Sequence, residues 1–186
     1  VQNLVVSDDL RKHFESEIYF TDAKAKKVFM IDNTEFSLLS GGIHAALPNY
    51  HTDWALLIDV KGYYSLIQMH YDLLSRALPP ESKEKFKWLY YERLRLKKSN
   101  PYLSKAMKTT ILSTWGAAGN QYSALYDPSV AALIMQVGQA YICDLCEKLQ
   151  PYAIIIQANT DGIMVRPKDG LYSTEPNASD IFKIND

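Results

Sequence analysis

Two short apolar runs on either side of a tight polar turn constrain this chain more than any other stretch. The runs are residues 153–156 and 163–165, and the turn between them reads Gln-Ala-Asn-Thr-Asp-Gly at 157–162. This pattern predicts a β-hairpin, in which Gly162 accepts the positive φ that such turns need. The hairpin would carry Asp161 at its tip. A turn aspartate is ordinarily only a turn former, so Asp161 needs a second group before it indicates chemistry.

Asp59 is the candidate for that second group. It follows the run Trp-Ala-Leu-Leu-Ile at 54–58, whose short and continuously apolar pattern predicts a buried strand. An ionised carboxylate on such an apolar element is a poor core residue, but two of them together are good ligands for a hard cation. The sequence therefore predicts that the carboxylates of Asp59 and Asp161 lie within bridging distance of a common cation.

Charge is unevenly distributed along the chain. At 186 residues and 47% apolar content, the chain suits one domain of ordinary size or a compact part of something larger. The net charge is −1, yet residues 81–108 hold nine Lys or Arg against three Glu, a balance of +6 that leaves −7 on the remainder. This division suits a protein whose basic part binds phosphates and whose acidic part binds divalent cations.

The remaining reactive residue types indicate no further site. Cys143 and Cys146 lie in an apolar helical pattern without two more thiolates, which favours structural burial over zinc binding. The four histidines lack metal-ligand spacing, and we assign them no chemistry. No apolar run has membrane-spanning length and no secretory signal opens the chain, which predicts a soluble protein in the cytoplasm. The first residue is Val rather than Met, which hints at a fragment.

The first half of the chain predicts a helix, a hairpin and a second helix. Residues 1–20 suggest a helix with a solvated face. Residues 27–32 and 35–39 predict a second hairpin, which Gly41-Gly42 interrupts. Residues 63–77 predict a helix that ends before Pro79-Pro80. Its buried face would comprise Leu66, Ile67, Leu73 and Leu74.

The second half predicts three helices and a loose tail. Residues 81–98 form a charged helix, and a break at 99–101 leads into a second helix that reaches about Trp115, so that the two make a basic helical hairpin. The hydrophobic residues of the first helix form a stripe that comprises Phe86, Leu89, Tyr90 and Leu94. After a break at 116–120, Asp127-Pro128 starts a helix, apolar on most of its circumference from 130 to 149, that should be buried against a sheet. The tail from Lys168 onward is polar and should be loosely held.

Two carboxylates from separate strands, with a basic helical pair between them in sequence, suit phosphoryl or nucleotidyl transfer. Divalent ions held by Asp59 and Asp161 would lower the pKa of an attacking hydroxyl, bridge substrate phosphates and neutralise a leaving pyrophosphate.

At these residues the chain resembles the palm and fingers of a family B DNA polymerase, closest to the bacteriophage type. Residues 59–66 resemble motif A, residues 108–116 resemble motif B, and residues 159–162 resemble the motif C turn in its phage form. Residues 41–44 resemble the family's entry to the polymerase region. Further matches lie at Tyr122, 125–128, 138–139 and 147–149, so that the resemblance covers about residues 36–166.

The resemblance implies an α/β fold of the α+β type, with an antiparallel palm sheet backed by helices. Residues 1–79 would form the first part of the palm, 80–116 a two-helix fingers hairpin, and 117–186 the second part of the palm. The family's exonuclease and thumb regions have no counterpart in this sequence. We therefore expect the chain to be a portion of a longer polymerase.

The resemblance also assigns roles to individual residues. Asp59 and Asp161 match the two metal-binding catalytic aspartates, with Mg²⁺ as the ion and Mn²⁺ as a substitute, and Val60 would offer its backbone carbonyl to the metal. Tyr64 matches the steric-gate tyrosine beneath the sugar of the incoming nucleotide. The triphosphate would be contacted by Lys108, which matches the motif B lysine, together with Arg93 or Lys97.

The sequence departs from the family pattern at several of these motifs. Asn159 stands where many members have Asp, and Ser65-Leu66 replaces Pro-Ser. Trp115 replaces a Tyr of motif B. Leu112 replaces the Asn of motif B, so that a side-chain amide able to hydrogen-bond near the nucleotide has become apolar.

The expected function is template-directed DNA synthesis on a primer–template, in which the primer 3′-hydroxyl attacks the α-phosphate of a deoxynucleoside triphosphate. No membrane partner is expected, and a phage-encoded chain would act in the cytoplasm of its bacterial host. A degenerate or truncated core that binds nucleic acid or nucleotide without catalysis is an alternative. A metal-dependent nuclease is another, although motif B and Tyr64 would have no role in it.

Overall fold

An antiparallel sheet forms the base of the fold in the computed structural model, which describes residues 7–15, 26–39 and 41–168. Six strands lie in the described part of the chain, in the spatial order β1-β2-β3-β5-β6-β4, and each pairs antiparallel with its neighbours. Their bounds are β1 Lys27–Ile31, β2 Thr34–Leu39, β3 Gly42–Ala46, β4 Leu56–Asp59, β5 Ala153–Asn159 and β6 Gly162–Pro167. With the helices described next, this sheet confirms the mixed α/β class.

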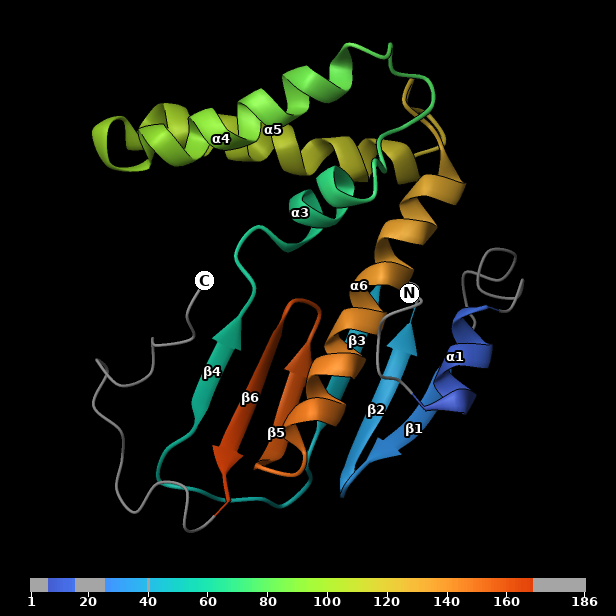
Figure 1. The fold of residues 1–186 in the computed structure, drawn as a ribbon, viewed down its shortest axis with the longest axis vertical. Coiled ribbons are helices and arrows are strands. Elements are labelled where there is room, and N and C mark those ends of the chain that lie inside the picture. Colours follow the sequence, from blue (N-terminus) through green and yellow to red (C-terminus); the bar gives the residue numbers. More distant parts are fainter. Residues whose placement is uncertain (1–6, 16–25, 40, 169–186) are drawn as a thin grey trace.

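The helices lie on one face of the sheet and at one end of it (Figure 1). The long helix α6 crosses the face, and α4 and α5 extend from the end as an antiparallel pair. The bounds of the described helices are α1 Asp8–Phe14, α3 Tyr63–His70, α4 Ser82–Ser99, α5 Pro101–Gly119 and α6 Pro128–Leu149.

The main core lies between α6 and the covered face of the sheet. In β2 the buried residues Thr34, Phe36 and Leu38 alternate with more exposed ones. This period of two is expected of a strand with one covered face. The opposite face of the sheet bears exposed side chains from β1 to β4, including Met30, Gln157 and Asp59. Among the described residues, no helix covers that open face.

Helix α6 begins and is buried as its sequence predicts. Asp127 caps its first turn by accepting a hydrogen bond from the backbone N–H of Val130, and Pro128 occupies the first turn. Its two buried glutamines satisfy backbone carbonyls: Gln139 donates to Leu39 and Gly42 at 2.6 and 2.8 Å, and Gln136 donates to Phe14. These bonds fix α6 to the β2–β3 turn and to α1.

The apolar character of α6 belongs to a core helix. By length and composition alone α6 could cross a membrane, yet most of it is buried within the fold, as in a soluble protein. The free thiols of Cys143 and Cys146 are buried in it, as predicted. Burial raises the pKa of Cys146 to about 12 and that of Cys143 well above its ordinary value.

The predicted basic helical hairpin is present as α4 and α5. Asn100 separates the helices and caps α5, since its side chain accepts a hydrogen bond from the N–H of Leu103. The predicted stripe of α4 is confirmed: Phe86 and Tyr90 are buried, and Leu89 and Leu94 pack against them. The pair thus has its own small core, separate from the one under α6.

Several predicted boundaries were wrong. The strand before Asp59 was expected to be buried, but β4 lies at the edge of the sheet and Leu57 is 67% exposed. The helix expected over 63–77 ends at His70, because Asp72 takes a φ of +57° and the chain turns. Leu66, expected in its buried face, is 40% exposed.

Two further boundaries depended on glycines. The helix expected to end near Trp115 continues through Gly116 to Gly119, because packing of α5 against α4 and α6 outweighs the low helix propensity of glycine. Gly42 was expected to interrupt the hairpin, but it begins the unpredicted strand β3, which joins the β1–β2 hairpin to β5. The expectations for the start of the N-terminal helix, for residues 16–20 and for the polar tail after Lys168 lie outside the described residues.

Candidate active site

Asp59 and Asp161 come together where β4 meets the hairpin of β5 and β6. Asp59 is opposite Gly162 in the β4–β6 register, and the N–H of Val60 donates to the backbone carbonyl of Asp161 at 2.9 Å. Both aspartates line a small cavity of about 200 Å³ with Gln157 and other residues of β4 to β6. Two residues about a hundred positions apart thus occupy one corner of the sheet.

The hairpin turn differs from its sequence-based description in one respect. The positive φ falls on Thr160, at +54°, and not on Gly162. Thr160 is held there because its N–H donates to the carbonyl of Ile43 at 2.9 Å. Gly162 allows β4 to pack closely against β6, since a Cβ at this position would lie 3.3 Å from the carbonyl oxygen of Ile58 and 3.5 Å from Oδ1 of Asp59. A side chain at 162 would therefore press on the strand that carries Asp59.

The two ionisable side chains that line the site are both carboxylates. Within the described residues, neither the Asp59 nor the Asp161 carboxylate has an ion pair or a side-chain hydrogen bond. No group of three or more His, Cys, Asp or Glu suited to a metal is present in the described ranges. Two carboxylates fit a hard divalent cation such as Mg²⁺, which retains water and substrate phosphate oxygens as further ligands. The side chain of Val60, the third predicted metal-binding residue, lines the larger cavity described below. The bridging distance between the carboxylates stays a prediction.

Tyr64 lies between this corner and α5. Its ring stacks on Trp115, with centroids 4.9 Å apart and planes 13° apart. Gly138 of α6 makes room for it, because a Cβ there would lie 3.4 Å from the Tyr64 ring. Burial, with the negative charge of Asp161, raises the pKa of Tyr64 to about 12, so the phenol stays neutral at ordinary pH.

Trp115 is the contact that the sequence left without a role. It appeared there only as a substitution in motif B, yet it joins α5 to Tyr64, and its Nε1 donates to the carbonyl of Ala131 in α6 at 3.3 Å. Its spacing of seven residues from Lys108 was the available signal, since such residues share one helix face.

The three cationic candidates all lie on the helical pair. Lys108 is exposed on α5, two turns or about 10 Å before Trp115 on the same face. Arg93 and exposed Lys97 are one turn apart on α4. The Nε of Arg93 is buried and has no hydrogen-bond partner within the described ranges. An anion between the helices would satisfy such a donor.

Leu112 lies one turn after Lys108 and is 44% exposed. Its spacing from Lys108 and Trp115 puts all three on one face of α5. This apolar side chain therefore sits on the face where an amide was expected from the motif.

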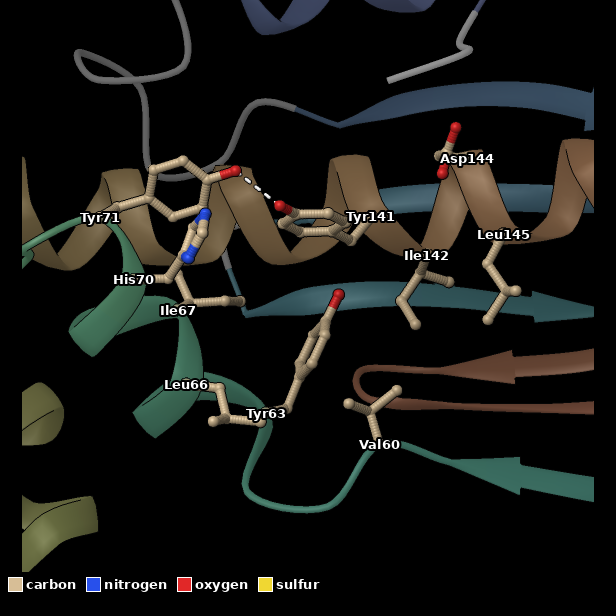
Figure 2. A pocket seen from close by; sticks show the side chains of 10 residues that line it. All are labelled: Val60, Tyr63, Leu66, Ile67, His70, Tyr71, Tyr141, Ile142, Asp144 and Leu145. Carbon is tan, nitrogen blue, oxygen red and sulfur yellow. Dashed lines mark hydrogen bonds between the residues drawn. The ribbon is translucent and has the colours of Figure 1, made fainter. Parts of the chain in front are cut away.

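A larger cavity lies between α3 and α6, on the helical side of the sheet (Figure 2). Its volume is about 460 Å³, and its lining is mostly apolar, with Tyr63, Ile67 and Leu145 among its walls. The hydroxyls of Tyr71 and Tyr141 are hydrogen-bonded at 2.6 Å along it. Its single carboxylate belongs to Asp144, which pairs with Lys148 of α6. The cavity lacks the paired carboxylates that a metal site needs, so we place the candidate site at the smaller cavity.

No family model matches the chain, and no curated protein sequence matches it.

Proposed function

We propose that the chain is the palm and fingers portion of a family B DNA polymerase and supports template-directed DNA synthesis. The proposal comprises an α+β palm sheet, β1 to β6 backed by α3 and α6, and a fingers hairpin of α4 and α5. Its partners would be a DNA primer–template, deoxynucleoside triphosphates and further regions of a longer polymerase. Its location would be the cytoplasm, that of the bacterial host if the gene is carried by a phage.

One observation carries the proposal. The β4–β6 register and the Val60-to-Asp161 hydrogen bond bring Asp59 and Asp161 to one corner of the sheet. Tyr64 follows Asp59 by five residues and contacts Trp115 of the basic helical pair. Tyr64 therefore connects the corner formed by Asp59 and Asp161, which we call the carboxylate corner, to the basic helical pair, and these three parts would serve nucleotidyl transfer.

The residues would divide the reaction as follows. Asp59, Asp161 and the Val60 carbonyl would hold Mg²⁺, which supplies the positive charge that favours an ionised primer hydroxyl and a leaving pyrophosphate. Lys108, with Arg93 or Lys97, would bind the triphosphate and orient its α-phosphate. Tyr64 would form the wall beneath the sugar.

Primer extension with Mg²⁺ tests the proposal. Asp161→Asn should lower incorporation roughly 10³-fold or more, because the bound ion supplies several kcal/mol of transition-state stabilisation. Duplex affinity should stay close to that of the unmodified chain, since this carboxylate holds metal rather than DNA.

Asp53→Asn is the matched control. Asp53 is 83% exposed and lies 3.5 Å from Arg166, just before β4, so the same chemical change there should leave incorporation unaltered. If Asp161→Asn lowers incorporation, duplex affinity and thermal stability together, Asp161 has a folding role and the proposal fails.

Leu112 favours a second candidate, a degenerate polymerase core. An exposed apolar side chain on the Lys108 face removes a hydrogen-bonding group from the proposed nucleotide site. Such a core would bind deoxynucleotides with Mg²⁺ and show no incorporation. The same extension assay, combined with nucleotide binding by calorimetry, separates the two candidates.

A further inference from the structure

Two aromatic side chains, followed by two basic ones, lie on the outer side of α4. Trp88 and Tyr91 are 61% and 63% exposed, and Arg95 and Lys98 are exposed after them. Spacings of three, four and three residues place all four on one side of an α-helix. We call Trp88, Tyr91, Arg95 and Lys98 the outer stripe.

The outer stripe is opposite the side through which α4 packs. Phe86 and Tyr90 are buried on that inner side, and Arg93 and Lys97 continue it toward the end of the helix. The inner side meets α5 and α3, and the pair extends away from the sheet (Figure 1). The proposed catalytic site therefore makes no use of the outer stripe.

The charge of α4 indicates the chemistry of a partner. The helix has seven Lys or Arg against two Glu, a balance of +5 that leaves −6 on the rest of the chain. Cores of protein–protein interfaces are depleted of charged residues. Sites for single-stranded nucleic acid instead combine cations for the phosphates with rings on which bases stack. The combination of rings and cations in the outer stripe matches the second kind of site.

We propose that the outer stripe binds the single-stranded template ahead of the primer terminus. Bases stack on Trp88 and Tyr91, and Arg95 and Lys98 contact the phosphates. The identity of the strand rests on the proposed function. The preference for unpaired bases does not, because a duplex hides the base faces that aromatic rings contact.

The dimensions and pairing of the outer stripe support this assignment. Its ten-residue span is about 15 Å of helix, the length of about four stacked nucleotides. Arg95 forms a salt bridge with Glu92, in which its Nε and Nη2 donate to the carboxylate oxygens at 2.8 and 2.5 Å. Lys98 has no ion pair in the described part of the chain, so it is the freer phosphate contact.

Trp88 gives the binding test its readout. Of the three tryptophans, Trp54 lies 3.8 Å under the Arg166 guanidinium and Trp115 is stacked on Tyr64, whereas Trp88 is exposed. A short oligothymidylate added without metal should quench tryptophan fluorescence. Its affinity, measured by anisotropy of a labelled strand, should fall about 5- to 100-fold in Trp88→Ala. Trp88→Phe should keep most of the affinity and lose the quench.

Tyr152→Ala is the matched control for Tyr91→Ala. Tyr152 is 60% exposed and directly precedes β5, which begins at the end of the sheet remote from α4 (Figure 1). Tyr91→Ala should weaken oligonucleotide binding and Tyr152→Ala should not. A duplex with a 5′ template overhang should respond as the single strand does, and a blunt duplex should bind all variants equally.

The remaining outcomes separate this inference from the proposed function. Unchanged oligonucleotide affinity in Trp88→Ala overturns the inference. If the same variant also converts a dimer into a monomer, the outer stripe is a protein interface instead. If the outer-stripe substitutions weaken binding of free single strands but not of the duplex with a 5′ overhang, the assignment to template is overturned. Outer-stripe binding in a chain whose incorporation ignores Asp161→Asn overturns the proposed function alone.

Discussion

Tyr64 is the residue at which the carboxylate corner and the helical pair meet. Its ring is fixed by the stack on Trp115 and by the close approach of Gly138, and it stays neutral because burial raises its pKa to about 12. A fixed, neutral ring beside Asp161 can exclude a substituent by bulk, without a hydrogen bond to it. The proposed role in sugar selection therefore depends on the ring and not on the hydroxyl.

The prediction at this scale follows from that distinction. Tyr64→Phe should keep the preference for deoxynucleotides, whereas Tyr64→Val should relax the rejection of ribonucleotides roughly 10- to 100-fold, because the wall is removed. The ratio of deoxy to ribo incorporation on one primer–template measures the effect. An unchanged ratio in an active Tyr64→Val variant would mean that the ring is only a part of the core.

At the scale of elements, the contact between β4 and β6 sets the position of Asp59. Gly162→Ala should push β4 away, because its Cβ would lie 3.3 Å from the Ile58 carbonyl oxygen. The expected loss in the free energy of unfolding is about 1–3 kcal/mol, together with weaker Mg²⁺ binding. Denaturant unfolding and metal titration measure the two effects.

The control for this substitution lies in α5. Gly116 is inside the helix, and an added Cβ there meets nothing within 4 Å. Gly116→Ala should therefore raise the free energy of unfolding by roughly 0.5–1 kcal/mol. Opposite signs for the two substitutions are required. A stabilising Gly162→Ala would show that an added Cβ at 162 does not clash with β4.

At the scale of the whole molecule, one ion pair joins the segment that leads into α4 to the start of α6. Arg76 donates through Nε and Nη2 to the Asp127 carboxylate at 2.8 and 2.7 Å, and its backbone N–H donates to the same group at 3.0 Å. The Asp127 side chain is only 3% exposed. The bonds from Arg76 hold the pKa of Asp127 well below its ordinary value of 3.8.

This lowered pKa gives a pH-dependent prediction. The carboxylate of Asp127 stabilises the fold fully above its unfolded pKa of about 3.9, and the stabilisation is lost as pH falls through the lower pKa of the folded state. Asp127→Asn should therefore cost about 1–2 kcal/mol near neutral pH, and the cost should shrink in acid. Urea unfolding of both proteins across this range measures the difference. A cost that is independent of pH would assign the effect to capping alone.

The sequence by itself determined most of the elements and identified the carboxylates of the candidate site. Asn100 and Asp127, each followed by a proline, mark the starts of α5 and α6, and two short apolar runs separated by a polar turn predict the hairpin of β5 and β6. These signals act between residues within one or two turns of each other, so they can be detected in the linear chain. The position of Asp59 at the end of a strand and of Asp161 in a hairpin turn was detectable for the same reason.

Tertiary structure alone decided the neighbours of those elements. The edge position of β4, the strand β3 opened by Gly42 and the stack of Trp115 on Tyr64 all depend on residues far apart in sequence. The pattern of one segment cannot show which side of it another segment will cover. An apolar run can thus become a half-exposed edge strand, and a tryptophan substitution can become the contact that joins α5 to the carboxylate corner, because burial and packing are settled only when distant segments meet.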